Sequence, residues 1–234
     1  MMNISLASYS GLGKRKNNED ACTVLENDRG LLAVVADGLG GQGNGEFASQ
    51  QAISTLREEL GSRDVDPEAL EAAITKANAD IFTLQEKHPG AQTTISAVWI
   101  KGNSAIAMHV GDTRIYQFRG DSVIYQSIDH TIAQLAVMSG DLKPEEIRTS
   151  KERNRLFRAL GDSEPPKVGS KLLELEKGDR LLLCSDGFWE GILEKDMIRL
   201  AKSTESAQGW LNEMRRIAEP LASDNNTAIA LLVS

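Results

Sequence analysis

The sequence predicts an α+β protein in which amphipathic helices pack against antiparallel β-structure. Three observations support this fold class. A continuous apolar run at 31–36 is typical of a strand that is buried on both faces. Two segments, 46–60 and 67–84, carry apolar residues at the three- and four-residue spacing of amphipathic helices. Between 93 and 127, short strand-like segments are separated by tight turns, which favours antiparallel pairing.

Composition indicates one domain, 1–234, that does not bind nucleic acid. A chain of 234 residues is long enough to bury roughly 70% of its unfolded surface in one core. The net charge of -8 disfavours nucleic acid and anionic membranes as partners, because both attract basic faces. The sequence begins without a signal-like segment, and no apolar run approaches the ~18 residues of a membrane span. We therefore expect a cytoplasmic protein.

The first charged segment is a polar, glycine-containing loop. It carries Arg15 and ends in two adjacent acids, Glu19 and Asp20. Strands are predicted on either side, at 5–10 and 21–25. A charged loop of this kind is often no more than a solvated turn, so it does not define a site by itself.

The buried strand at 31–36 ends in Asp37, and five glycines follow within eight residues. The segment Gly38-Leu39-Gly40-Gly41-Gln42-Gly43 matches the dinucleotide-binding pattern G-x-G-x-x-G, with Glu58 or Glu59 near the expected ribose-binding position. Against that interpretation, Asp37 would face a pyrophosphate, and the next segment is a second helix rather than a parallel strand. A carboxylate beside an open glycine carbonyl is instead a natural ligand pair for a hard divalent cation.

The rest of the chain alternates predicted strands and helices. Asp66 as N-cap and Pro67 at the first helical position start the second amphipathic helix. Short turns predict hairpins between the strands that follow. Two short helices then interrupt the β-rich region, and insertions of this kind often cover functional sites. The predicted strands are 93–100, 104–110, 114–118, 122–127, 171–175, 180–184 and 227–233, and the predicted helices are 130–139, 144–152, 194–202 and 205–218.

Four aspartates follow or precede predicted strands: Asp37, Asp112, Asp186 and Asp224. One such residue is usually an ordinary turn aspartate. If four converge, carboxylates about 4 Å apart repel each other by up to ~4 kcal/mol per pair at an effective dielectric constant of 20. Convergence would therefore require cations. Oxygen ligands without a neighbouring pair of Cys or His point to Mg²⁺ or Mn²⁺ rather than zinc.

A set of short motifs runs through nearly the whole chain in a fixed order. In chain order these are Arg15 with Glu19-Asp20, Asp37-Gly38-x-Gly40-Gly41, Thr93-Thr94, Gly111-Asp112-Thr113-Arg114, Asp129-His130, Asn154-x-x-x-Arg158-Ala159-Leu160-Gly161, Ser185-Asp186-Gly187 and Asp224-Asn225-x-Thr227. Together they resemble the metal-dependent (PPM, type 2C) Ser/Thr protein phosphatases. Leu39, where eukaryotic members commonly have His, and the insertion at 131–153, which resembles a flap, favour the bacterial-type branch.

The resemblance implies an α-β-β-α sandwich of two mainly antiparallel sheets flanked by helix pairs, with a small helical flap. It also implies two bridged Mn²⁺ or Mg²⁺ ions at one end of the sandwich. By position, Asp37 would bridge both ions. Asp186 and Asp224 would be further ligands of one ion, and Glu19 with the Gly38 carbonyl would be ligands of the other. The implied activity is hydrolysis of phosphoserine and phosphothreonine in proteins by a metal-activated water.

The remaining roles also come from the resemblance. Arg15 would bind the phosphate, and with Asp37 and Asp186 it would form the catalytic set. Asp112, together with Asp186, would hold a third, weaker metal. Asp20 and Asn225 would support the ligands without touching the ions. Because Leu39 cannot donate a proton, a water on the third metal is the best remaining general acid.

The expected partners are phosphorylated Ser/Thr proteins and a cognate Ser/Thr kinase, and we expect a monomer. The alternative is a catalytically weak scaffold of the same fold that only binds phosphoproteins or a kinase. Intact Asp37, Asp186 and Asp224 argue against that alternative. For His109 we expect a packing role, and for His130 a hydrogen bond within a turn.

Overall fold

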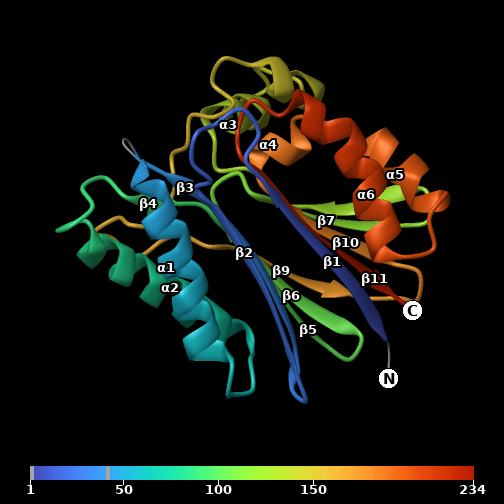
Figure 1. The fold of residues 1–234 in the computed structure, drawn as a ribbon, viewed down its shortest axis with the longest axis horizontal. Helices are drawn as coiled ribbons and strands as arrows, with labels where there is room; N and C mark the ends of the chain where they lie inside the picture. Colours follow the sequence, from blue (N-terminus) through green and yellow to red (C-terminus); the bar gives the residue numbers. More distant parts are fainter. Residues whose placement is uncertain (1–2, 41–42) are drawn as a thin grey trace.

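The computed structural model describes residues 3–40 and 43–234 and contains two antiparallel sheets packed face to face (Figure 1). Two residues of the glycine-rich motif, Gly41 and Gln42, lie outside the described residues. The five-stranded sheet has the order β1-β11-β10-β7-β8, and the six-stranded sheet has β2-β3-β5-β6-β9, with β4 paired to β3. The strands are β1 (Ile4–Gly11), β2 (Asp20–Asn27), β3 (Gly30–Leu39), β4 (Gln92–Thr93), β5 (Ile95–Lys101), β6 (Ser104–Val110), β7 (Arg114–Arg119), β8 (Ser122–Gln126), β9 (Gly169–Glu174), β10 (Arg180–Cys184) and β11 (Asn226–Val233).

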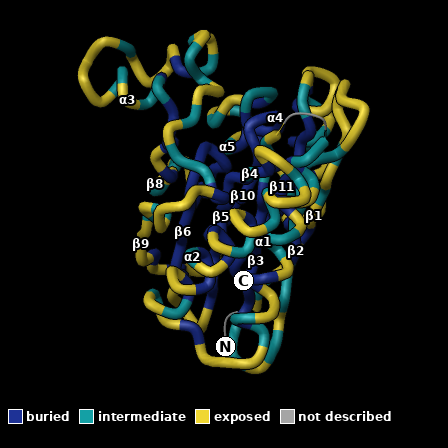
Figure 2. Tube along the Cα trace, turned by 90° about the vertical axis from the view of Figure 1, so that its left-hand side faces the viewer, coloured by how far each residue is buried: buried dark blue, intermediate teal, exposed yellow. Residues whose placement is uncertain are grey.

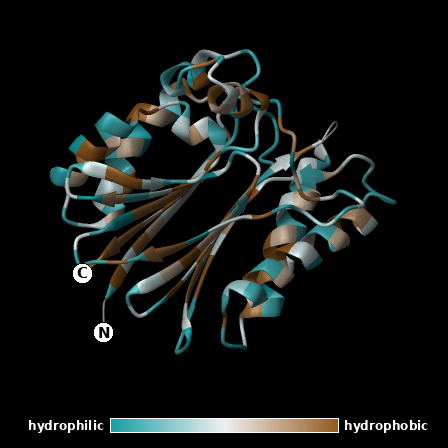
Figure 3. Ribbon diagram, turned by 180° about the vertical axis from the view of Figure 1, so that it is seen from behind, coloured by the Kyte–Doolittle hydropathy of each residue, from teal (hydrophilic) through white to brown (hydrophobic). Residues whose placement is uncertain are grey.

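Helices cover the outer face of each sheet, which confirms the predicted α-β-β-α sandwich (Figures 1 and 3). Helices α1 (Gly45–Leu60) and α2 (Pro67–Leu84) pack on the six-stranded sheet. As predicted, the Asp66 carboxylate caps α2 by accepting a hydrogen bond from the Ala69 amide, at 2.8 Å. The helices on the five-stranded sheet are α4 (Asp186–Trp189), α5 (Glu194–Lys202) and α6 (Ala207–Ala218), followed by the 3₁₀ helix η3 (Glu219–Leu221).

Strand β3 shows why its sequence is continuously apolar. Leu32, Val34 and Ala36 face α1 and α2, whereas Leu31 and its alternate neighbours face the other sheet. Both faces are therefore buried, and the alternation expected of a half-exposed strand is absent. In Figure 3 the hydrophobic colour runs along the strands of both sheets. Asp37 follows directly, so the core fixes the backbone that presents this carboxylate.

One predicted hairpin is wrong. The turn 111–113 does not join neighbouring strands, because β6 pairs with β5 and β9 whereas β7 pairs with β10 and β8. The turn instead carries the chain from one sheet to the other. Gly111 adopts a positive φ of 100° there, a conformation that glycine adopts without steric cost. Asp112 is thereby placed at the end of the sandwich, between the two sheets.

The predicted insertion at 131–153 contains α3 (Ile132–Ser139) and the 3₁₀ helix η2 (Pro144–Thr149). The predicted helix 130–139 begins two residues later because the Thr131 hydroxyl caps it. The predicted helix 144–152 ends early, because Ser150 is extended. Within the described ranges, no helix is long and apolar enough to span a membrane.

Candidate active site

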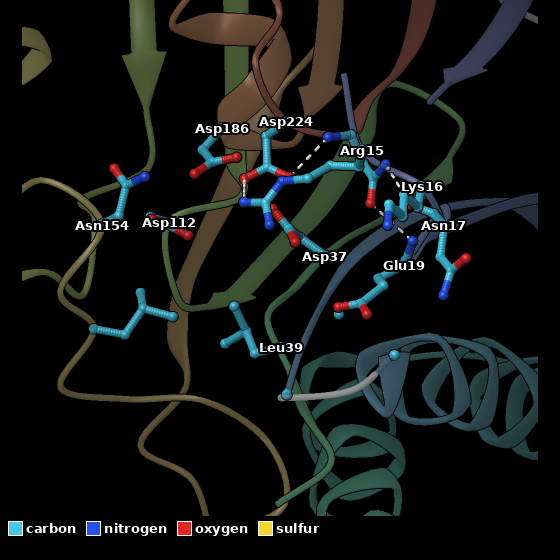
Figure 4. Close-up of a pocket in the computed structure, with 15 residues that line it drawn as sticks. Arg15, Lys16, Asn17, Glu19, Asp37, Leu39, Asp112, Asn154, Asp186 and Asp224 are labelled. Carbon is cyan, nitrogen blue, oxygen red and sulfur yellow. Dashed lines mark hydrogen bonds and ion pairs between the residues drawn. The ribbon is translucent and has the colours of Figure 1, made fainter. Parts of the chain in front are cut away.

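The predicted site residues meet in one cavity of about 530 Å³ at the end of the sandwich (Figure 4). It is polar, and it is built from strand ends, the loop before β2, and the segment that follows the insertion. The lining residues are Arg15, Lys16, Asn17, Glu19, Asp37, Gly38, Leu39, Gly40, Gly43, Asp112, Asn154, Leu156, Asp186, Asp224 and Asn225. Eight of the nine predicted site residues are in this lining, and we call the cavity the acidic pocket.

Asp20 is the ninth predicted residue, and it lies behind the pocket. It sits opposite Asp37 in the register of β2 and β3. The Ser185 hydroxyl donates to its Oδ2 at 2.8 Å, whereas its Oδ1 has no hydrogen-bond partner among the described residues. Asp20 therefore connects the strand that carries Asp37 with the turn that carries Asp186.

The backbone around Asp37 is held on both sides. The Thr94 hydroxyl accepts a hydrogen bond from the Asp37 amide at 3.2 Å, and the Thr93 hydroxyl donates to the Asp37 carbonyl at 2.9 Å. The next residue must be glycine, because a Cβ on Gly38 would lie 2.2 Å from the Gly45 carbonyl oxygen and 2.5 Å from that of Glu19. These contacts leave the Asp37 side chain directed into the pocket (Figure 4).

Asp186 and Asp224 lie at the same end of two neighbouring strands of the five-stranded sheet. Asp186 follows β10, and Asp224 precedes β11, its antiparallel neighbour. Asn225 ties this region to the loop before β2. Its side-chain amide donates to the carbonyls of Leu12 and Asn17, and its Oδ1 accepts from the Glu19 amide at 2.8 Å. Asn225 therefore positions the backbone that carries Glu19.

Asp112 is almost completely buried, with 4% of its surface exposed. Its carbonyl accepts a hydrogen bond from the Trp189 indole at 3.1 Å. Arg114 stacks on the same indole, 3.5 Å from the ring centroid, and forms a buried bidentate ion pair with Asp129. Arg114 and Asp129 belong to the motifs but do not line the pocket, so their role is to hold the Asp112 turn.

Arg15 lies at the mouth of the pocket and donates to the Asp224 carboxylate. Figure 4 shows its guanidinium beside Asp224 and directed toward Asp37. The contact raises the pKa of Arg15. A planar guanidinium in this position suits the oxygens of a phosphate group.

The carboxylates resist ionisation in this arrangement. Burial raises the pKa of Asp186 to about 7, with the charge of Asp224 adding to the effect. Burial and neighbouring aspartates also raise the pKa values of Asp37 and Asp112 well above the ordinary value. Asp37 retains some solvent contact because the pocket opens above it, but its carboxyl group is surrounded by protein and other acids. A cation among these groups would relieve both effects.

The donor set fits divalent metal ions. Every candidate donor is a carboxylate or carbonyl oxygen, the type that Mg²⁺ and Mn²⁺ prefer. Among the described residues, however, no three His, Cys, Asp or Glu side chains are already spaced as a metal centre. One of the candidate donors, the Asp224 carboxylate, is paired with the Arg15 guanidinium. The Oδ1 atom of Asp20, the residue paired with Asp37 in the sheet register, has no hydrogen-bond partner among the described residues.

Sequence reasoning assigned no role to several residues that line the pocket, among them Lys16, Asn17, Asn154 and Leu156. Asn154 belongs to a quoted motif, so its place in the motif order was a usable signal. Lys16 and Leu156 had no such signal, because a charged loop residue and a single leucine are common everywhere.

Comparison with known proteins agrees with this geometry. The model of the protein phosphatase 2C family matches residues 9–231. A putative protein phosphatase 2C-type from Streptococcus pyogenes is 30% identical over 239 residues, covering 99% of this chain and 97% of that protein. The Ser/Thr phosphatase structure from S. agalactiae superposes with a TM-score of 0.91 at 27% identity over 100% of both chains. The catalytic domain of PstP, in complex with two manganese ions, gives a TM-score of 0.85 at 29% identity, over 100% of this chain and 99% of that one. The chain therefore belongs to the protein phosphatase 2C family.

Proposed function

We propose that the acidic pocket is where this serine/threonine protein phosphatase hydrolyses phosphoserine and phosphothreonine in proteins. The observation that carries the proposal is the meeting of Asp37, Asp186 and Asp224 with Arg15 in one cavity. A set of buried acids beside one phosphate-binding cation is suited to two-metal phosphate ester hydrolysis. The manganese ions in the PstP complex and the all-oxygen donor set support Mn²⁺ or Mg²⁺ as the cofactor.

The proposed metal ligands are acids and a carbonyl that line the acidic pocket. Asp37 would be shared by two ions. Asp186 and Asp224 would complete the protein ligands of one ion, and Glu19 with the Gly38 carbonyl would complete those of the other. When bound, the two ions lower the pKa of the attacking water and neutralise charge on the phosphate.

The chain's own residues then bind and orient the substrate. Arg15 can exchange its contact with Asp224 for the phosphate oxygens, because both side chains are partly solvent-exposed. Asn225 holds the backbone of Glu19, and Asp20 braces the Asp186 turn through Ser185. Leu39 has no proton to give to the leaving group. We therefore assign protonation of the leaving group to the third-ion site, which Asp112 would form with Asp186.

We further infer a monomeric cytoplasmic enzyme that forms one domain over 1–234, with 131–153 as its flap, and that opposes a Ser/Thr kinase. The apolar layer shared by the two sheets supports a single domain. The flap assignment is supported by the position of this segment, directly before pocket residues Asn154 and Leu156.

A phosphothreonine peptide assay of chelator-treated protein tests the proposal. We expect no turnover without metal and full recovery with Mn²⁺ or Mg²⁺. Turnover that persists after chelation, or that returns only with Zn²⁺, would contradict an oxygen-ligand centre in the acidic pocket.

A further inference from the structure

A second cavity, of about 630 Å³, is bordered by residues adjacent in sequence to those of the acidic pocket. It is bounded by the edge strands β8 and β9, by α3, and by the segment that follows the insertion. Figure 2 shows β8 and β9 along the same side of the molecule, with α3 above them. We call this the edge cavity, because β8 and β9 are the outer strands of their sheets.

The walls of the edge cavity are apolar and exposed. Its apolar lining residues are Ile124, Ile128, Leu135, Met138 and Phe157, which are 47%, 57%, 42%, 68% and 37% exposed. Scattered apolar residues are normal on a protein surface, but a group around one hollow indicates a binding site. The volume is also within the range of about 300–1,000 Å³ for ligand pockets.

The polar groups of the edge cavity define the chemistry of its ligand. Arg158 and Lys171 line it, and neither forms an ion pair in the part of the chain that the structure describes. Asp129 also lines it, but its carboxylate is already paired with Arg114 at 2.7 Å. His109 forms part of the wall, and its Nε2 donates to the Ile128 carbonyl at 2.8 Å. Its Nδ1 is buried and has no partner among the described residues. Two unpaired cations in a protein of net charge -8 favour an anion.

The edge cavity and the acidic pocket share two thin walls. One is the segment 154–158, in which Asn154 and Leu156 face the acidic pocket whereas Phe157 and Arg158 face the edge cavity. The other is the end of β6 with the turn that follows it, where His109 of the strand lines the edge cavity and Asp112 of the turn lines the acidic pocket.

His130 connects the two walls. Its ring stacks on His109, with centroids 4.8 Å apart, and its Nδ1 accepts a hydrogen bond from the Gly111 amide at 3.1 Å. Its carbonyl accepts one from the Phe157 amide at 3.0 Å. These contacts connect both walls to the backbone next to Asp112.

We propose that the edge cavity binds a small organic anion with an apolar body, and that its occupancy changes turnover in the acidic pocket. The apolar body would lie among Ile128, Met138 and Phe157. The acid group would face Arg158 and Lys171.

Anilinonaphthalene sulfonate is a suitable probe, because it combines an aromatic body with a sulfonate. Its fluorescence should report saturable binding to the manganese-loaded protein. Ile128→Glu and Lys171→Glu should each weaken binding at least tenfold. The matched controls are Leu172→Glu, an exposed leucine of β9 that is 64% exposed and does not line the edge cavity, and Lys167→Glu, an exposed lysine outside it. Both controls should bind the probe within twofold of the unmodified protein.

Inorganic phosphate separates the two cavities. Saturating phosphate should leave probe binding unchanged, because phosphate occupies the acidic pocket; competitive displacement would overturn the assignment. Sedimentation should show a monomer, and a dimer that excludes the probe would mean that a second copy of the chain covers this face. Thermal melting identifies any variant that fails to fold, and Lys171→Ala then replaces it.

Turnover of p-nitrophenyl phosphate tests the coupling. The probe should change kcat at least twofold, with its half-maximal effect at the measured dissociation constant, and the effect should disappear in Ile128→Glu. Binding in the edge cavity with unaltered kcat would refute the coupling. This result is distinct from a failure of the proposed phosphatase site, which would remove turnover with and without the probe.

Discussion

Arg15 and Asp224 form an ion pair at the mouth of the acidic pocket, although 209 positions separate them in the chain. Their side chains are 59% and 31% exposed, and pairs exposed in this way contribute about 1 kcal/mol or less. Arg15 is therefore kept close to the pocket without being fixed to Asp224. A residue that must exchange a carboxylate for a substrate phosphate needs this weak attachment.

We expect Arg15→Ala to lower kcat/KM on a phosphothreonine peptide roughly ten- to a hundredfold, the effect of losing a charge-assisted contact of ~1.5–3 kcal/mol. Binding of Mn²⁺, measured by calorimetry, should not weaken, because the substitution removes a cation that competes for Asp224. Lys14→Ala is the matched control, since Lys14 is exposed and does not line the pocket. An equal loss of affinity for a neutral ligand would show that Arg15 is structural.

Asp186→Asn removes one charge from the acidic pocket and preserves the shape of the side chain. We expect kcat to fall by orders of magnitude because a metal ligand is lost. The metal-free variant should melt at a higher temperature than the unmodified protein, since the charge of Asp224 and burial both disfavour an ionised Asp186. Asp28→Asn, at an exposed position before β3, should change neither property. Unchanged turnover in Asp186→Asn would make Asp186 an ordinary turn residue.

The pocket acids also predict how pH affects stability. Burial raises the pKa of Asp186 to about 7 and that of Asp20 to about 6, from 3.8. Between the raised pKa values and the ordinary value of 3.8, the folded protein binds more protons than the unfolded chain. The free energy of unfolding therefore increases as the pH falls from about 7 toward 4. Urea denaturation of chelator-treated protein should therefore show greater stability near pH 5 than near pH 8.

Two comparisons test this explanation of the pH dependence. Saturating Mn²⁺ should remove most of the increase, because metal-bound carboxylates stay ionised. Asp186→Asn should reduce it, because one of the titrating groups is missing. The trend should reverse at lower pH, since Asp179 and Glu194, whose pKa values are lowered in the fold, lose their contribution when they are protonated. A free energy of unfolding that falls steadily from pH 8 to pH 5 would contradict the raised pKa values.

Much of the fold could be predicted from local patterns. The apolar run of β3, the cap at Asp66 and the helical spacing of α1 and α2 each depend on neighbouring residues, and each is confirmed. The turn after β6 was the exception. A three-residue turn is compatible with a hairpin or with a change of sheet, and only the pairing of β7 with β10, far along the chain, distinguishes the two.

The residues of the site could also be predicted only in part from the sequence. Acids at strand ends indicated a metal pocket, and the order of the motifs supplied the positions. The same order did not separate residues that face the pocket from those that hold it in place. Arg114 and Asp129 lie in motifs next to Asp112 and His130, yet they pair with each other in the interior. That distinction requires the packing of Trp189 against Arg114, a contact between distant segments.

This buried pair makes a separate prediction. Arg114→Met should lower the free energy of unfolding by about 3–5 kcal/mol, the usual cost of leaving one buried charge unpaired. The double variant Arg114→Met with Asp129→Asn should recover part of the loss in urea denaturation, because no unpaired ion remains. Arg216→Met is the matched control, since this arginine pairs with Glu213 and both side chains are exposed. A loss at Arg114 no larger than that at Arg216 would show that the pair does not support the Asp112 turn.

Asp112 provides the test of the proton donor. Leu39 lies in the pocket without a group that can protonate the leaving oxygen, and Asp112 is the acid on the opposite wall, held by the Trp189 indole. If the third-ion site at Asp112 supplies the proton, Asp112→Ala should leave two ions bound and sharply reduce kcat on phosphoserine peptides. p-Nitrophenyl phosphate should lose less, because its leaving group needs little protonation. Equal losses on both substrates would refute the donor role, and loss of the first two ions in calorimetry would place Asp112 among the ligands of the central pair.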